Sequence, residues 1–173
     1  MIFVSGIHGV GKTYFCTMIK KQLNISSYSA SELISKRGKK KLSSDKRTSE
    51  IALNQIYLEE AINELNKDSK KFILDGHFCL LDSDQKISRI PREVFFTLKP
   101  DLIVLLKEKS FVIAARRLQR DGVVVDEDFI STFQQEEEIY AKEIANQLEI
   151  NLLVSYGSND LEGIIEKIRE EVL

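Results

Sequence analysis

The stretch from Gly6 to Thr13 constrains this chain more than any other part of its sequence. It reads Gly-Ile-His-Gly-Val-Gly-Lys-Thr, which fits the pattern G-x-x-x-x-G-K-[ST]. It follows the apolar, β-forming run Ile2–Ser5 and precedes Tyr14–Leu23, which has the character of a helix. Glycines let such a loop turn its backbone N–H groups toward a di- or triphosphate, and the helix N-terminus adds a favourable dipole. A chance match in a glycine-rich turn is the alternative, but the flanking strand and helix favour a nucleoside triphosphate site.

The same pattern assigns roles within this phosphate loop, Gly6–Thr13. Lys12 is expected to reach the β- and γ-phosphates, and the Thr13 hydroxyl is expected to ligate Mg²⁺. ATP and Mg²⁺ are therefore the predicted cofactors. The residues expected to contact ATP are Gly6, His8, Gly9, Val10, Gly11, Lys12, Thr13 and Tyr14.

A second informative stretch is the predicted strand at residues 71–74, which runs into Asp75, a glycine and His77. In open α/β sheets the ligand lies outside the carboxyl ends of the strands, so Asp75 is the expected second ligand of Mg²⁺. Asp101 precedes its strand, residues 102–106, and so belongs to the opposite edge. Two alternatives stay open: Asp75 caps a turn, and His77 either orients the attacking group or packs under the loop.

Strands alternate with helices along the whole sequence. Expected strands lie at residues 2–5, 24–28, 71–75, 102–106 and 150–155, and the main expected helices at 14–23, 48–65, 109–120, 126–147 and 161–172. This order predicts an α/β fold in three layers, a P-loop NTPase domain with a five-stranded parallel sheet and helices on both faces. We expect residues 1–173 to form one domain, with an irregular connection at residues 79–92.

Composition narrows the classes of partner. The net charge of −2 gives no basic field for nucleic acid, and no apolar run approaches the roughly 18 residues needed to span a bilayer. Cys16 and Cys79 lack metal-type spacing and fit reduced thiols, so with no signal-peptide pattern we expect a cytoplasmic protein. The cation-rich run at residues 36–46 is either a solvated, mobile loop or a phosphate-attracting arm over the site.

Four stretches together resemble the nucleoside-monophosphate kinases, nearest the archaeal-type and atypical adenylate kinases. They are Gly6–Thr13, Ser29–Ile34, Leu74–His77 and Arg116–Asp121. The resemblance implies sheet order 2-3-1-4-5, an acceptor-binding helical insertion at about residues 30–67 and a short lid at about 117–126. It further implies that Arg117 stacks on the ATP base, that Arg120 approaches the phosphates, and that Asp75 with His77 forms the metal-side motif.

The predicted function is a kinase that transfers the γ-phosphoryl of MgATP to a small molecule, a nucleoside monophosphate or a similar phosphorylated acceptor. The expected catalytic residues are Lys12, Asp75, His77 and Arg120, and the cations placed to bind the acceptor phosphate are Arg37, Arg89 and Arg92. A solvated basic helix end is the alternative reading of the arginines near residue 120, and Arg116 fits it best. The alternative function is an ATP-binding or ATP-hydrolysing switch that acts through a protein partner, which the acidic run Glu136–Glu138 favours.

Overall fold

The computed structural model describes residues 1–41, 50–67, 70–82 and 84–172. The strands are β1 (Ile2–Ser5), β2 (Ser26–Ser29), β3 (Phe72–Asp75), β4 (Cys79–Leu81), β5 (Ile87–Arg89), β6 (Leu102–Leu106) and β7 (Leu152–Ser155). The helices are α1 (Lys12–Leu23), α2 (Ala30–Lys41), α3 (Glu50–Asn66), α4 (Arg92–Leu98), α5 (Ser110–Asp121), α6 (Glu127–Leu148) and α7 (Leu161–Val172), with a 3-10 turn, η1 (Gly157–Asn159).

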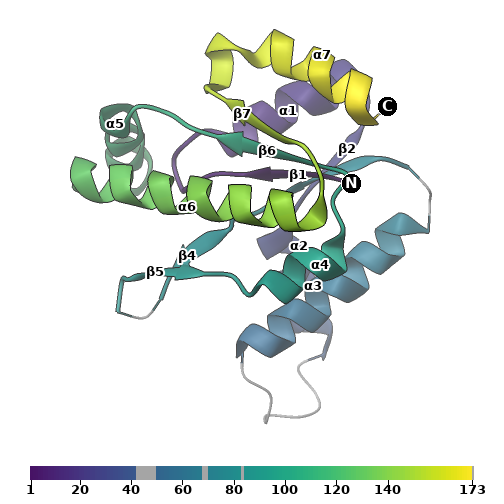
Figure 1. The fold of residues 1–173 in the computed structure, drawn as a ribbon. Coiled ribbons are helices and arrows are strands. Elements are labelled where there is room, and N and C mark those ends of the chain that lie inside the picture. The colour runs from purple at the N-terminus through teal and green to yellow at the C-terminus, as the bar shows by residue number, and fades with distance from the viewer. Residues whose placement is uncertain (42–49, 68–69, 83, 173) are drawn as a thin grey trace.

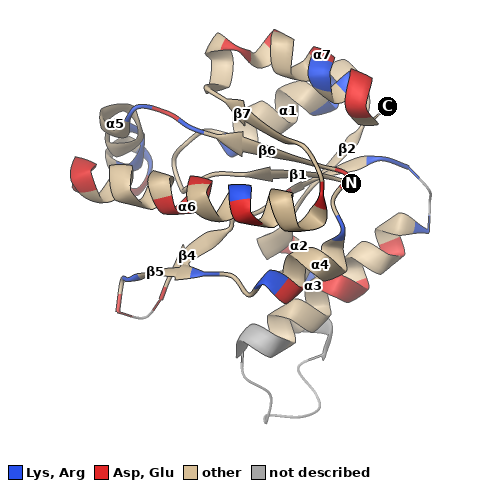
Figure 2. Ribbon diagram, viewed as in Figure 1, with Lys and Arg blue, Asp and Glu red and all other residues tan. Residues whose placement is uncertain are grey.

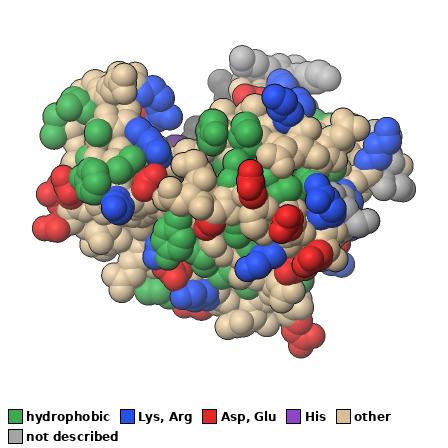
Figure 3. Space-filling model, turned by 90° about the horizontal axis from the view of Figure 1, so that it is seen from above, with side chains coloured by type: hydrophobic (Ala, Val, Ile, Leu, Met, Phe, Trp, Pro, Cys, Tyr) green, Lys and Arg blue, Asp and Glu red, His purple; other side chains and the backbone are tan. Residues whose placement is uncertain are grey.

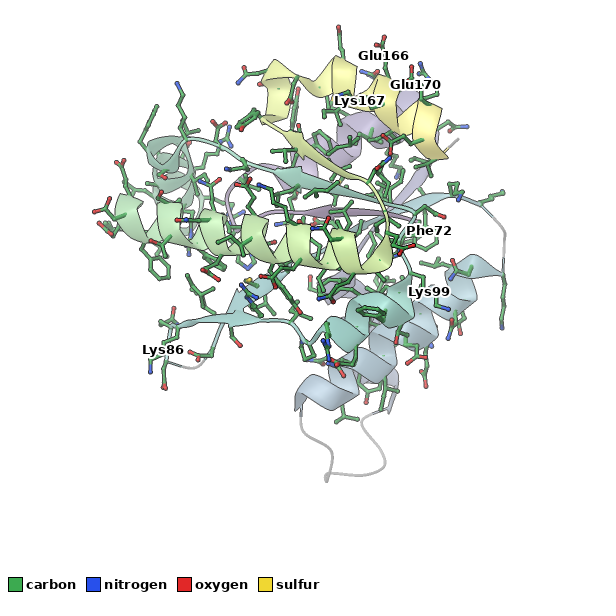
Figure 4. The ribbon with its side chains drawn as sticks, in the orientation of Figure 1. Phe72, Lys86, Lys99, Glu166, Lys167 and Glu170 are labelled. Atoms are coloured by element: carbon green, nitrogen blue, oxygen red, sulfur yellow. The ribbon has the colours of Figure 1, made fainter. Side chains whose placement is uncertain are left out.

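Within the described ranges, a parallel sheet of five strands forms the middle layer, in the order β2-β3-β1-β6-β7 (Figure 1). Counted along the chain, these strands have the predicted order 2-3-1-4-5. Helices α1 and α7 cover one face, while α6 and α4 cover the other, so the three-layer α/β expectation is confirmed. On α7 the charged side chains of Glu166, Lys167 and Glu170 lie on its outer, exposed side (Figure 4).

The strand register brings chemically useful residues to one edge of the sheet. Val4 of β1 pairs with Asp75 of β3 and with Val104 of β6. Ser29, the last residue of β2, also lies opposite Asp75. The central strands β1 and β6 are buried along their whole length, because their side chains are packed by helices on both faces. Polar residues that follow these strands therefore gather at the carboxyl edge.

An aromatic cluster fixes the loop that follows β3, residues 76–78. The ring of Phe78 is stacked on Phe95 at 4.6 Å between centroids, and Phe3 packs edge-on against Phe78 at 5.2 Å. Tyr140 of α6 packs on the same group, and its hydroxyl donates to the carbonyl of Ile90 at 2.7 Å. Such packing holds the β3–β4 loop close to β1, where the phosphate loop begins.

Two expectations about irregular segments were wrong. Residues 79–92 contain an antiparallel hairpin, β4 and β5, instead of an irregular connection. Its strands have three residues each, too few to show a periodic pattern, and its turn is held by Asp82, whose carboxylate accepts from the backbone of Asp84 and Lys86 at 2.9 Å. Lys86 lies at the outer end of this hairpin (Figure 4).

The cation-rich run at residues 36–46 was the second wrong expectation, because residues 36–41 belong to helix α2 instead of a loop. Arg37 explains the difference: its guanidinium pairs with Glu60 and Glu64 of α3, which joins the two helices side by side. Residues 42–46 lie outside the described residues. Helices α2 and α3 occupy the segment where the acceptor-binding insertion is predicted, and its role stays a prediction. Among the described residues, no helix has the length and apolar character needed to cross a bilayer.

Candidate nucleotide and phosphoryl-transfer site

The phosphate loop has the backbone shape that an anion site requires. Gly9 has a φ of 91°, in the left-handed region, and a Cβ there would stand 2.9 Å from Cγ of Arg117. Gly11, with a φ of 111°, precedes α1 and offers no side chain to cap that helix. The first turn of α1 also carries no acidic residue. The first N–H groups of α1 are thus left for an external acceptor, which suits a phosphate.

Lys12 is held inside this loop and faces the end of β3. Its Nζ donates to the carbonyl of Gly6 at 2.6 Å, and it lies 3.5 Å from Nε2 of His77 and 4.0 Å from Oδ1 of Asp75. The side chain is only 8% exposed. Burial lowers the pKa of Lys12, while the carboxylates of Asp75 and Glu137 act in the opposite direction. The structure therefore brings three of the predicted catalytic residues together at the carboxyl edge.

His77 is a neutral residue in this environment. Burial, followed by the charge of Lys12 and the nearness of His8, lowers the pKa of His77 to about 2. Its Nδ1 is buried and has no hydrogen-bond partner among the described residues. The rings of His8 and His77 lie 4.3 Å apart. Seen from above, a histidine lies at the bottom of a hollow bordered by Lys or Arg side chains (Figure 3).

Asp75 and His8 are also shifted from their ordinary titration ranges. Burial raises the pKa of Asp75, the charge of Lys12 lowers it, and Glu32 adds a smaller upward effect. The pKa of His8 is lowered, first by loss of hydration and then by the charges of Lys12 and Arg117, although much of its side chain remains exposed. Thr13 and Tyr14 are exposed at the start of α1, so the Thr13 hydroxyl is open to a ligand.

The three arginines of α5 have different surroundings. Arg117 covers the phosphate loop at Gly9, and its Nε is buried without a partner among the described residues. Arg120 is exposed and forms two hydrogen bonds to the carboxylate of Asp121 at 2.7 Å. Its charge nevertheless contributes to lowering the pKa of His8 and of Lys12 in the phosphate loop.

Arg116 is exposed, which agrees with the alternative of a solvated helix end, but it also makes contacts that this alternative does not include. Its Nη1 donates to the carbonyl of Val10 at 2.9 Å, and its Nη2 pairs with Glu108 at 3.2 Å. Glu108 belongs to the β6–α5 connection, residues 107–109, which carries both signs of charge (Figure 2). Arg116 therefore ties the phosphate loop to this connection.

Glu137 of α6 is a site residue that the sequence reasoning missed. Its carboxylate accepts from the backbone N–H of Gly6 at 3.2 Å, of Phe78 at 2.9 Å and of Cys79 at 2.7 Å. Burial raises the pKa of Glu137, while these amides and Lys12 lower it. A signal was present in the sequence, because Glu137 falls on the apolar stripe of its helix. That stripe consists of Ile130, Phe133, Tyr140, Ala141 and Ile144.

The two neighbours of Glu137 are paired within the chain as well. Glu136 pairs with Arg89, and Glu138 pairs with Lys107 and Lys142. Three residues before Glu137, Gln134 exchanges two hydrogen bonds with the backbone of Glu108, at 2.8 and 3.0 Å. Helix α6 therefore contacts several of the loops at the carboxyl edge.

The three arginines proposed for the acceptor contact different parts of the fold. Arg37 pairs with Glu60 and Glu64 of α3. Arg89 pairs with Glu136 and Glu143 and lies 4.8 Å above the ring of Tyr140. Arg92 is exposed and pairs with its neighbour Glu93. The structure does not gather these side chains around one point, and each guanidinium has a carboxylate partner.

A cavity of about 460 Å³ lies at the carboxyl ends of β6 and β7. It is lined by Lys107, Glu108, Lys109, Tyr156, Asn159 and Asp160. Because β1, β6 and β7 run parallel, the cavity lies at the same edge of the sheet as the phosphate loop. An aromatic ring and hydrogen-bonding groups at its wall suit a flat heterocycle such as a nucleobase.

The donor set at this edge fits ATP with Mg²⁺. Free N–H groups at the start of α1 and the ammonium of Lys12 suit phosphate oxygens, and the buried Nε of Arg117 is a further unmatched donor. The Thr13 hydroxyl and the Asp75 carboxylate are the hard oxygen ligands that Mg²⁺ prefers. In the described ranges, no group of three or more His, Cys, Asp or Glu side chains could hold a metal ion by itself. Two protein oxygens are nevertheless typical of a Mg²⁺ ion that is also bound by phosphates and waters.

Comparison with known proteins agrees with this geometry. Residues 5–134 match the family described as AAA domain, and the chain belongs to this family. A comparison with curated proteins gives no match. Several solved structures share the fold at low sequence identity, and some of them carry the name of a kinase.

Three of these structures illustrate the likeness. Shikimate kinase from Aquifex aeolicus has 17% identity and a TM-score of 0.56, covering 98% of this chain and 93% of that one. A gluconokinase from Sinorhizobium meliloti has 16% identity and a TM-score of 0.52, covering 96% and 87%. A putative kinase from Chloroflexus aurantiacus has 13% identity and a TM-score of 0.54, covering 99% and 97%.

Proposed function

We propose that this protein is an ATP-dependent phosphotransferase that passes the γ-phosphoryl of MgATP to a small-molecule acceptor. The observation that carries the proposal is the meeting of Lys12 with Asp75 and His77 beside the open end of α1. Phosphoryl transfer depends mainly on positioning and on charge around the moving group, and it requires no protein nucleophile. Lys12 and the α1 amides supply the positive half of such a site, and Asp75 with Thr13 supplies the oxygen ligands.

Each part of the nucleotide has a proposed binding region. The phosphate loop and Lys12 would hold the phosphates, while Thr13 and Asp75 would hold Mg²⁺, which neutralises phosphate charge when bound. The cavity beside Tyr156 would receive the base, with Arg117 over it. Arg120 would have to leave Asp121 to approach the phosphates, and a closing movement of residues 117–126 would allow this.

A nucleoside monophosphate is the first acceptor class that we propose. The four sequence stretches that resemble nucleoside-monophosphate kinases support it, as do the α2–α3 pair next to the carboxyl edge and the cations Arg37, Arg89 and Arg92. Binding of an acceptor phosphate would replace the glutamates that now pair with these arginines, since phosphate accepts the same forked hydrogen bonds. Small hydroxy acids are the second class, because the fold is shared with a shikimate kinase and a gluconokinase.

The alternative function, an ATP-binding or ATP-hydrolysing switch, has less support. That hypothesis was based on the acidic run Glu136–Glu138 as a surface for a protein partner. Glu137 is buried, and Glu136 and Glu138 are paired with cations of the same chain. A partner would have to compete with these internal contacts, which favours the kinase.

The deciding experiment is an ADP-release assay with MgATP and a panel of acceptors: nucleoside monophosphates, unphosphorylated nucleosides and small hydroxy acids. We expect at least one acceptor to raise ADP release well above the basal rate. The variant Lys12→Ala should lose most of this stimulated rate, on the order of 100-fold, because it removes a cation from the transferring group. If no acceptor raises ADP release above the basal hydrolysis, the kinase proposal fails and the switch replaces it.

A further inference from the structure

Glu137 joins two segments of the site that are far apart in the sequence. One oxygen, Oε1, accepts from Gly6 at the start of the phosphate loop and from Phe78 in the β3–β4 loop. The other, Oε2, accepts from Cys79. The side chain is 1% exposed, so these amides replace the water that a carboxylate otherwise requires.

A carboxylate is an unusual choice for this position if its only role were to fill the core. Apart from Gln134, its buried neighbours on the same helix face are apolar, and burial of a carboxylate is costly unless its oxygens are hydrogen-bonded. An apolar residue of similar size would pack in the same space, but it would leave the three N–H groups without acceptors. The carboxylate of Glu137 therefore supplies hydrogen-bond acceptors to both loops and connects them.

The two loops that Glu137 connects carry the residues that meet at the site. The phosphate loop carries Lys12, and the end of β3 with the β3–β4 loop carries Asp75 and His77. Lys12 meets these two residues across the gap, at 4.0 and 3.5 Å. A shift of either loop would change both distances, and Glu137 is bonded to both loops.

We propose that Glu137 is a positioning residue, which fixes the phosphate loop relative to the β3–β4 loop so that Lys12 stays opposite Asp75 and His77. The proposal deepens the proposed function and rests on it for its effect on turnover. Its structural part, the coupling of the two loops, does not depend on any reaction.

Two substitutions separate shape from charge. Glu137→Gln keeps the shape, and its carbonyl can still accept from Gly6 and Phe78, but its NH₂ group then faces the N–H of Cys79. Glu137→Asp keeps the charge but is shorter by one methylene, so it cannot reach both loops as Glu137 does. If Glu137 acts by position, both variants are impaired.

A control must show what loss of stability alone does. Ile144 lies on the same helix, is fully buried, and makes no polar contact with the site. Ile144→Ala should lower the melting temperature by leaving a cavity, while the loops keep their connection. Assays are run well below the melting temperature of every variant.

The first readout is nuclear magnetic resonance of backbone amides, with MgADP as the probe. In the wild type, MgADP should shift the signals of Thr13 in the phosphate loop region and also those of Phe78 and Cys79. In Glu137→Asp, which cannot reach both loops, we expect the shifts at Phe78 and Cys79 to fall by at least half, while Thr13 keeps its shift. Equal shifts in wild type and Glu137→Asp would overturn the proposal, as would the same decrease in Ile144→Ala.

The second readout is steady-state kinetics with the acceptor found in the panel. We expect kcat to fall at least tenfold in both Glu137 variants, with the KM for MgATP within threefold, and Ile144→Ala to keep kcat within twofold. A wild-type kcat in Glu137→Asp would show that charge, not position, is what matters, and it would overturn the proposal.

If neither Glu137 variant folds, amide hydrogen exchange in the wild-type protein tests whether Glu137 couples the two loops. After each exchange rate is corrected for the intrinsic rate of that amide, a shared clamp predicts one common free energy of opening for Gly6, Phe78 and Cys79, which MgADP raises by the same amount at all three. Three independent free energies of opening would overturn it. Absence of any turnover in the wild type would remove the proposed function, while the amide measurements would still decide the coupling of the loops.

Discussion

At the scale of single residues, the site concentrates ionisable groups in a small buried volume. Lys12 is flanked by Asp75, His77 and Glu137. Burial lowers the pKa of Lys12 and His77 and raises the pKa of Asp75 and Glu137, which in each case favours the neutral form. Such shifts are typical of functional sites. They also affect stability, because a group that binds its proton more tightly in the unfolded chain lowers the free energy of unfolding as the pH falls.

His77 gives the clearest consequence for pH. Its pKa is about 2 in the folded protein and close to 6.5 in the unfolded chain, so between these values the unfolded chain binds the proton more tightly. Above pH 6.5 His77 is neutral in both states and does not reduce the free energy of unfolding. As the pH falls below 6.5, His77 is protonated in the unfolded chain only, so the free energy of unfolding decreases. We expect the free energy of unfolding to decrease by roughly 1–2 kcal/mol between pH 7 and pH 5 from this residue.

Urea titrations at several pH values would measure this. The variant His77→Gln stays neutral, so its unfolding free energy should vary less between pH 7 and pH 5. His8→Gln is the comparison, because the pKa of His8 is also lowered but its side chain is more exposed, so it should change the pH profile less than His77→Gln does. Identical pH profiles for wild type and His77→Gln would contradict the buried, neutral state of His77.

Residues whose placement depends on local spacing could be predicted from the sequence, while their roles stay predictions. The phosphate loop residues and Asp75 follow from a motif and from the end of a strand, both of which are local features. Glu137 and Arg116 could not be predicted in this way, because their contacts depend on how α6 and α5 pack against the loops. A charged residue on an apolar stripe was the signal for Glu137, and no comparable signal marked Arg116.

At the scale of elements, the contact between α5 and the phosphate loop is sensitive to substitution. Gly9→Ala should weaken nucleotide binding, because its Cβ would meet Arg117 at 2.9 Å and Ile113 at 3.2 Å, and because its φ of 91° strains a residue with a side chain. We expect the affinity for MgADP to fall on the order of tenfold. Calorimetric titration measures this directly.

Gly122→Ala is the control for this prediction. Gly122 also has a positive φ, of 67°, but a Cβ there would meet nothing within 4 Å. It therefore carries backbone strain without the clash against Arg117. Equal losses of MgADP affinity in the two variants would show that Arg117 has no part in the effect.

The elements themselves were predicted well where they are long or buried. The helix at residues 126–147 and the strand at 102–106 differ from α6 and β6 by no more than one residue at either end, because periodic or continuous apolar runs define them. The β4–β5 hairpin was missed because three-residue strands carry no readable period. The end of α2 was missed because ion pairs with α3, not its own composition, hold it.

At the scale of the whole molecule, the proposed acceptor half of the site would depend on how α2–α3 and the β4–β5 hairpin lie around the carboxyl edge. Arg37 and Arg89 bind glutamates of α3 and α6 in the absence of an acceptor. Replacement of both by alanine should raise the KM for a phosphorylated acceptor at least tenfold, since each removes a charge-assisted hydrogen bond, and should leave MgATP affinity within twofold.

Steady-state kinetics with the acceptor from the panel tests this expectation. Arg169→Ala, on the exposed side of α7, serves as the control for loss of an arginine. An unchanged acceptor KM in the double variant would remove Arg37 and Arg89 from the acceptor site. It would then favour an acceptor without a phosphate.

The arrangement of the sheet could be predicted from strands that alternate with helices, together with the strand order implied by the resemblance. The location of the nucleotide half followed from the same reasoning. The acceptor half could not be fixed, because its side chains come from helices whose mutual packing depends on contacts far apart in the sequence.

The pairing of α2 with α3 through Arg37 has a consequence for protein engineering. The pair enters the fold directly after Ser29 of β2 and returns to the sheet at β3, while β1, the phosphate loop and α1 lie outside it. A different helical hairpin could be grafted between the same two strands, from Ala30 to Asn66. Under the proposed function, such an exchange would replace the acceptor contacts made by α2–α3 and keep the phosphate loop, Lys12 and Asp75 in place.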